Sequence, residues 1–129
     1  MEENIPNENN IGVVKISDEV VGVIAGLAAT EIKGVVGMSG KLAGGITQIF
    51  TGKKNISKGV KVNVGEESAS IDLYIVVKYG IKIPDVALSV QKNVKKAVET
   101  MTGLNVSAVN IFVQNVYLPK DEEKEESEN

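Results

Sequence analysis

The sequence predicts an α+β fold, a two-layer sandwich in which two main amphipathic helices lie on one face of a mixed β-sheet. Apolar residues recur at helical spacing in two stretches, each opened by a capping signal and followed by glycine. Apolar and polar residues alternate in other stretches, as in half-buried strands. The order strand, helix, glycine, strand occurs twice, in residues 16–38 and 83–113, around a predicted hairpin.

The first half of the domain should run strand, helix, strand. Residues 11–16 form a short apolar run. Ser17 follows as a candidate N-cap, and two acids behind it suit the positive end of a helix dipole. Gly34 should end this helix, and a short strand should follow over residues 35–38. The apolar stripe of the helix consists of Val20, Ile24, Leu27, Ala28 and Ile32.

The second half should hold a hairpin, a longer helix and a final strand. Residues 60–64 and 71–79 alternate as two strands, with a turn at 66–68. Pro84 suits the first turn of a helix, and Gly103 suits its C-terminal cap. The last strand should run from Val109 to Leu118. The buried stripe of this helix is expected to be Val86, Val90, Val94, Ala97, Val98 and Met101.

The composition removes several kinds of chemistry. The chain of 129 residues has room for one domain, and it contains neither Cys nor His. Disulfides, thiolate sites and the commonest general base are therefore absent. All 14 basic residues are Lys, so the bidentate arginine fork is missing as well. The carboxylates show no calcium-loop spacing and no acid–base pair. We expect no catalytic residue, no metal and no cofactor.

Charge divides the chain into three parts. Residues 1–10 and 120–129 are acidic and are expected to be disordered, with a combined net charge of −7. Residues 11–119 form the single predicted domain, which carries a net charge of +4. No targeting segment and no apolar run long enough for a bilayer are apparent. The protein is therefore expected in the cytoplasm.

Residues 40–59 are rich in Gly and Lys, and the apolar patch at 46–50 is compatible with one helical turn. The lysines of this region occur in a span of 21 residues without an acid, which is typical of an anion-facing surface. A solvated, flexible loop explains them equally well. Sequence-specific reading of nucleic acid is not expected without Arg. The Lys-rich loop comprises Lys41, Lys53, Lys54, Lys58 and Lys61.

The sheet face that the helices do not cover is the second candidate site. Strand alternation places two of the chain's five aromatic residues on it, together with β-branched residues. An exposed apolar patch often marks a contact, whereas ordinary strand composition is the alternative. The candidate contact face comprises Tyr74, Val76, Phe112 and Val116.

Taken in order, several apolar segments resemble the alkaline shock protein family, envelope stress response proteins of Gram-positive bacteria. They include GVVKIS at 12–17, VVGVIA at 20–25, EIKGV at 31–35, GVKV at 59–62, IDLYIVV at 71–77, TGL at 102–104 and VNI at 109–111. The resemblance covers about residues 11–118. It implies a cytoplasmic, non-enzymatic protein. Some members gather at the inner membrane surface through a membrane-anchored partner, and others are of regulatory or unknown function. The family has no catalytic motif, so no site residue carries over.

Two functions from different classes follow as hypotheses. The first is a scaffold or adaptor of the envelope stress response, cytoplasmic or peripheral to the inner face of the membrane. It would act through protein–protein contacts, with a membrane-anchored partner or an envelope enzyme, and through self-association. The alternative is a module that binds nucleic acid or anionic surfaces through the Lys-rich loop. An enzyme is the least favoured class.

Overall fold

The computed structural model describes residues 2–5, 11–41, 47–50, 56–65 and 68–118. In chain order its elements are β1 (Glu2–Ile5), β2 (Val14–Ser17), α1 (Asp18–Thr30), β3 (Val35–Lys41), β4 (Thr47–Phe50), the 3₁₀ turn η1 (Ile56–Gly59), β5 (Val60–Val64), β6 (Ala69–Lys78), α2 (Ile83–Thr102) and β7 (Val106–Tyr117). Residues 66 and 67 of the predicted turn lie outside the described residues, and so does the whole acidic tail at 120–129.

Both helices begin where the capping signals predict. The hydroxyl of Ser17 accepts a hydrogen bond of 3.3 Å from the N–H of Val20, which opens α1. Pro84 lies in the first turn of α2, and Gly103 ends that helix in the left-handed conformation, with φ 77°. The helix α1 ends at Thr30, before the predicted stop. Gly34 instead lies in the following turn with φ +106°, where the chain enters β3.

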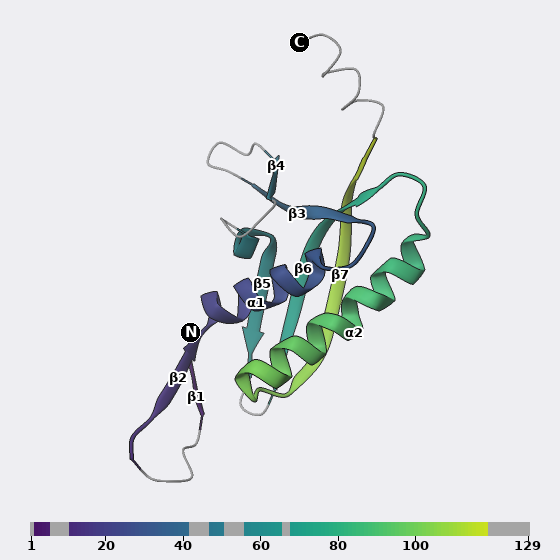
Figure 1. Ribbon diagram of the computed structural model, residues 1–129. Helices are drawn as coiled ribbons and strands as arrows, with labels where there is room; N and C mark the ends of the chain where they lie inside the picture. The colour runs from purple at the N-terminus through teal and green to yellow at the C-terminus, as the bar shows by residue number, and fades with distance from the viewer. Residues whose placement is uncertain (1, 6–10, 42–46, 51–55, 66–67, 119–129) are drawn as a thin grey trace.

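The main sheet is mixed, and β6 is its central strand. One edge of β6 pairs with β7 in parallel along nearly its whole length. The other edge pairs antiparallel with β5 and, further along, with β3, which carries β4 on its far side. Figure 1 shows α1 and α2 on the same side of this sheet. The predicted two-layer α+β sandwich is confirmed.

The core lies between the helices and the sheet and is aliphatic. Val90, Val94 and Val98 of α2 are fully buried, and alternate residues of β6 face them. Met101, which was expected in this stripe, is 68% exposed. The buried positions follow a spacing of four residues, so Thr102 takes the next place, and its hydroxyl donates to the Val98 carbonyl at 2.6 Å.

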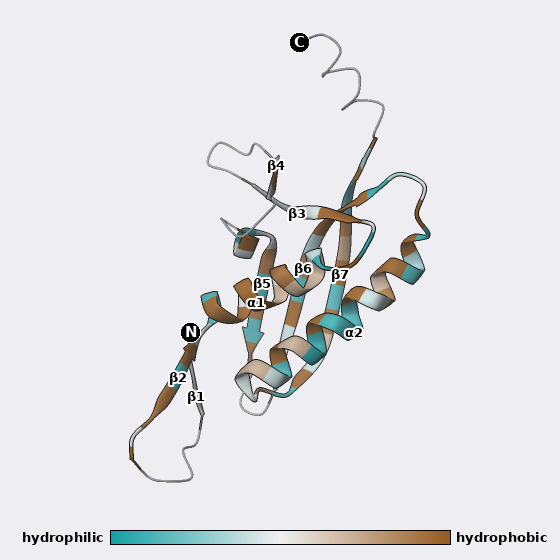
Figure 2. Cartoon of the chain, viewed as in Figure 1, coloured by the Kyte–Doolittle hydropathy of each residue, from teal (hydrophilic) through white to brown (hydrophobic). Residues whose placement is uncertain are grey.

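Two predictions about the segments outside the core are wrong. Residues 2–5 were expected to lack regular structure, yet β1 pairs antiparallel with β2 in a separate two-stranded sheet. This hairpin projects from the body, and Figure 2 shows hydrophobic and hydrophilic residues along β2. The patch at 46–50 was interpreted as compatible with one helical turn. Its residues 47–50 form β4 instead, because β3 extends to Lys41 and offers an edge for a further strand.

Candidate protein-contact face

The outer face of the sheet, opposite the helices, is built by alternation along β6 and β7. Ile71, Leu73 and Ile75 point into the core, so the residues between them point outward. The parallel register then sets Asp72 beside Asn110 and Tyr74 beside Phe112. Residues 38 positions apart in the chain thus form one surface.

The centre of the outer face is an aromatic pair. The rings of Tyr74 and Phe112 stack with their centroids 5.0 Å apart and an angle of 17° between their planes. Offset stacking of this kind contributes beyond the apolar area it buries. Phe112 is still 41% exposed, so much of its surface remains accessible to another molecule. The sequence placed both residues correctly on this face.

Val76 lies on the same face but is not a contact residue, because it is only 1% exposed. At this level β6 has a neighbour on each side, with Gly37 of β3 on one and Asn115 of β7 on the other. Val76 is therefore buried beneath the outer face and is not accessible to a partner.

Val116 does not belong to the outer face. The register between β6 and β7 shifts by one residue after Ile75 and Val113, where β7 contains a β-bulge. Beyond the bulge, Val116 pairs with Val77, which belongs to the helix-side core. A single inserted residue reverses the alternation, which explains why simple counting gave the wrong face.

Polar groups border the aromatic pair on the side of β5. The Asn110 amide donates a hydrogen bond of 2.9 Å to the Asp72 carboxylate. Lys61 of β5 lies in register with Asp72 on the neighbouring strand. An apolar centre with a polar border is the usual arrangement of a protein contact surface.

The Lys-rich loop is only partly described. Lys53 and Lys54 lie outside the described residues, and Lys41 is placed only as part of strand β3. Lys58 belongs to η1 and is exposed, and Lys61 is exposed on β5. Residues 41–61 contain no acid, but the fold places an acid beside them, because Asp72 of β6 is the register partner of Lys61.

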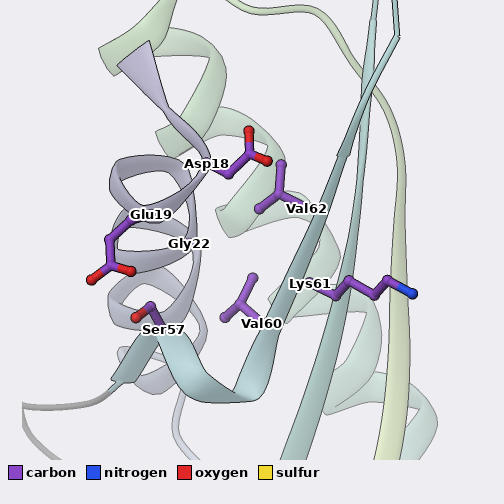
Figure 3. A pocket seen from close by; sticks show the side chains of 7 residues that line it. All are labelled: Asp18, Glu19, Gly22, Ser57, Val60, Lys61 and Val62. Carbon is purple, nitrogen blue, oxygen red and sulfur yellow. The ribbon is translucent and has the colours of Figure 1, made fainter. Parts of the chain in front are cut away.

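A shallow hollow of about 270 Å³ lies between α1 and β5. Its lining includes Asp18 and Glu19 from the first turn of α1 and Ser57 from η1. Figure 3 shows Val60 pointing toward α1, whereas Lys61 points to the opposite side of the strand. Within the described part of the chain, no group of three or more His, Cys, Asp or Glu could hold a metal ion.

Sequence analysis missed a polar network between α2 and β7. Gln91 donates to the Val109 carbonyl at 3.0 Å, and Lys95 donates to the Val106 carbonyl at 2.7 Å. Glu99 accepts from the Val106 N–H at 2.9 Å. This backbone hydrogen bond, followed by that from Lys95, holds the pKa of Glu99 below its usual value. Gln91, Lys95 and Glu99 are spaced four residues apart, which places them on one side of the helix. This spacing was the only signal of the network in the sequence, and it also fits a helix face exposed to solvent.

The fold and this face together define a small α+β domain with one sheet face covered by helices and the other presenting an aromatic pair. A model of the alkaline shock protein 23 family, described as having a cell envelope-related function, matches residues 6–118. The chain therefore belongs to this family, in agreement with the resemblance found in the sequence. Its function is thus related to the cell envelope. No solved structure matches the chain.

Curated relatives support this assignment. The chain is 42% identical to the uncharacterized protein YqhY of Bacillus subtilis over 109 residues, which is 84% of this chain and 80% of the relative. It is 46% identical to the uncharacterized protein YloU of the same organism over 107 residues, 81% of this chain and 88% of the relative. A stress response regulator gls24 homolog of Streptococcus pyogenes is 30% identical over 105 residues, covering 81% of this chain and 59% of the relative. The name of the streptococcal relative describes stress response regulation, and the names of the two Bacillus relatives specify no function.

Proposed function

We propose that this chain is a scaffold or adaptor of the envelope stress response and that its outer sheet face is the surface that binds partner proteins. The observation that carries this proposal is the stacked pair of Tyr74 and Phe112 on the helix-free face. Phe112 remains 41% exposed beside the central strand β6, and an accessible aromatic side chain is a suitable anchor for a partner. The polar border at Asp72 and Asn110 would orient the complex.

The partner is expected to be a protein at or near the cytoplasmic face of the membrane. The described helices include none that is long and apolar enough to cross a bilayer. Attachment through an anchored protein would give such a chain access to the envelope. The family description and the name of the streptococcal relative support an envelope or stress role. The adaptor mechanism itself is our proposal.

Affinity purification with matched variants tests the proposal. The double variant Tyr74→Ser, Phe112→Ser removes both rings from the outer face. Met101→Ser removes a residue that is 68% exposed on α2 and serves as the control. We expect the double variant to lose specific partners that the wild type and the control retain. If all three proteins recover the same partners in equal amounts, the outer face is not the binding surface.

Binding of nucleic acid or anionic surfaces through the Lys-rich loop remains the alternative hypothesis. No described contact favours it, and the position of Asp72 beside Lys61 reduces the local positive potential. Recovery of partners that disappears on nuclease treatment would favour this alternative.

A further inference from the structure

The strand β7 leaves one long edge of the main sheet open. Within the described part of the chain, β7 pairs only with β6, so its other edge has no strand beside it. Its 12 residues contain no charged side chain and no Pro. Natural edge strands usually carry such residues because a bare edge is a template for another strand. The strand β7 itself therefore carries no residue that protects its edge.

Side chains cover the backbone groups at the two ends of this edge. Near the start of β7, Lys95 and Glu99 bind both backbone groups of Val106, and Gln91 binds the carbonyl of Val109. Near its end, the Asn115 side chain accepts the N–H of Val116 at 2.8 Å. The ends of the edge are therefore already occupied by hydrogen bonds within the chain.

The middle of the edge is different. Successive residues of a strand turn their N–H and C=O groups to opposite edges. Val109 turns its carbonyl away from β6 toward Gln91, so Ile111 and Val113 turn their backbone groups in the same direction. The short stretch from Ile111 to Val113 thus presents donors and acceptors to whatever lies beside β7.

Exposed apolar side chains lie on both sides of this stretch. Phe112 is 41% exposed on the outer face. On the helix side, Leu88 is 51% exposed and lies one turn before Gln91 on α2, on the side of the helix that reaches the edge. Val116 and Leu118, at the end of the strand, are 40% and 42% exposed. A strand added here would bury apolar surface on both of its faces.

We propose that β7 pairs antiparallel with β7 of a second copy of this chain, about a two-fold axis at Phe112. In this register, Ile111 of each copy exchanges backbone hydrogen bonds with Val113 of the other. The pairing uses the groups in the open middle of the edge and leaves the capped groups of Val106 and Val109 undisturbed.

A second copy fits this edge for two reasons. The register is self-complementary, since each copy offers the donors and acceptors that the other needs. It also opposes no charges, because β7 has none. The two Phe112 residues face each other at a non-hydrogen-bonded position, where Cα atoms are about 4.5 Å apart. The stack that Tyr74 begins in one copy then continues across the axis into the other.

This inference shares Phe112 with the proposed function but is separable from it. The chain has no cysteine, so a single introduced thiol reports on one position. We expect Phe112→Cys to form a disulfide-linked dimer under mild oxidation. Asn110→Cys is the matched control on the same face. In the proposed register the two copies of residue 110 are four residues apart along the strands, about 13 Å, which is too far for a disulfide.

Charge exchange supplies a second test that does not depend on oxidation. Phe112→Lys and Phe112→Glu should each sediment as monomers, because like charges would oppose each other across the axis. An equimolar mixture of the two should sediment as a dimer, which also shows that both variants are folded. A wild type that stays monomeric at millimolar concentration would overturn the proposal, as would equal crosslinking at positions 110 and 112. Continued capture of partners by that monomer would leave the adaptor function standing.

Discussion

Glu99 and Val106 are joined by a hydrogen bond of 2.9 Å from the Val106 N–H to a carboxylate oxygen, across the turn that links α2 to β7. The same oxygen accepts from Lys95 at 3.0 Å, and Lys95 also donates to the Val106 carbonyl. One ion pair of the helix therefore satisfies both backbone groups of a strand residue. This ring of contacts fixes the start of β7 against α2.

The stability of the domain should decrease in acid partly through Glu99. In the folded chain its pKa lies below the ordinary value of 4.5, chiefly because of the Val106 N–H and then Lys95. Its carboxylate therefore stabilises the fold above pH 4.5, and this contribution is lost as the pH falls through the lower folded pKa. Glu99→Gln should lower the melting temperature at pH 7 and have a smaller effect at pH 3. Glu128→Gln, in the acidic stretch at 120–129, is the control, and an equal pH profile for both variants would contradict the role of Glu99.

Val94→Asp should prevent folding or nearly so. The side chain is fully buried among aliphatic residues, and a charge there would cost several kcal/mol, of the order of a small domain's whole stability. Circular dichroism during heating measures the effect. Lys92→Asp, two residues away on the exposed side of α2, should melt close to the wild type. A Val94→Asp protein that melts within a few degrees of the wild type would contradict the described core.

Gly26→Ala should destabilise the chain although alanine favours helices by about 1 kcal/mol over glycine. A Cβ atom at Gly26 would lie 2.9 Å from Cγ1 of Ile56, which is too close for packed atoms. Such overpacking typically costs about 1–3 kcal/mol. Gly22→Ala is the graded comparison, because its Cβ would lie 3.3 Å from Cβ of Ser57. In urea unfolding, Gly26→Ala should have a lower free energy of unfolding than Gly22→Ala. The reverse order would contradict the close contact of α1 with η1.

Removal of the acidic tail should strengthen binding to anionic surfaces at low salt. Residues 120–129 hold six acids and two Lys, attached to a domain of net charge +4. Each exposed pair contributes only about 0–1 kcal/mol, but tethering gives the tail an effective concentration of about millimolar. A chain truncated after Pro119 should therefore be retained longer on anionic vesicles. The gain should shrink toward 0.15 M salt, where the screening length is about 8 Å. Equal retention of both chains at low salt would leave the tail without this role.

The elements that local rules govern could be predicted from the sequence. Ser17 and Gly103 specify the start of α1 and the end of α2 because capping depends on a few neighbouring backbone groups. The hairpin of β5 and β6 follows from strict alternation on both strands. The aromatic pair of Tyr74 and Phe112 was also placed correctly, since alternation holds over most of β7.

What the sequence did not reveal depends on pairing between distant segments. The bulge that moves Val116 off the outer face is a property of two strands in register and has no signal in one strand alone. The strand β1 lies in a polar stretch and gains its structure from β2. The contacts of Gln91 and Glu99 become visible only when α2 is laid against β7, because their spacing is that of any exposed helix face.

The parallel pairing of β6 with β7 has a consequence for the order of folding. The hairpin of β5 and β6 forms from neighbouring residues, but β7 reaches β6 only after the whole of α2 has crossed the sheet. Long-range pairing of this kind is slow, since the entropy of closing a large loop is lost before the stabilising contacts form. During synthesis, one edge of β6 stays unpaired until β7 has left the ribosome. The nascent chain therefore completes this sheet only after α2 and β7 have both been translated, and until then the edge of β6 that β7 will occupy can mispair.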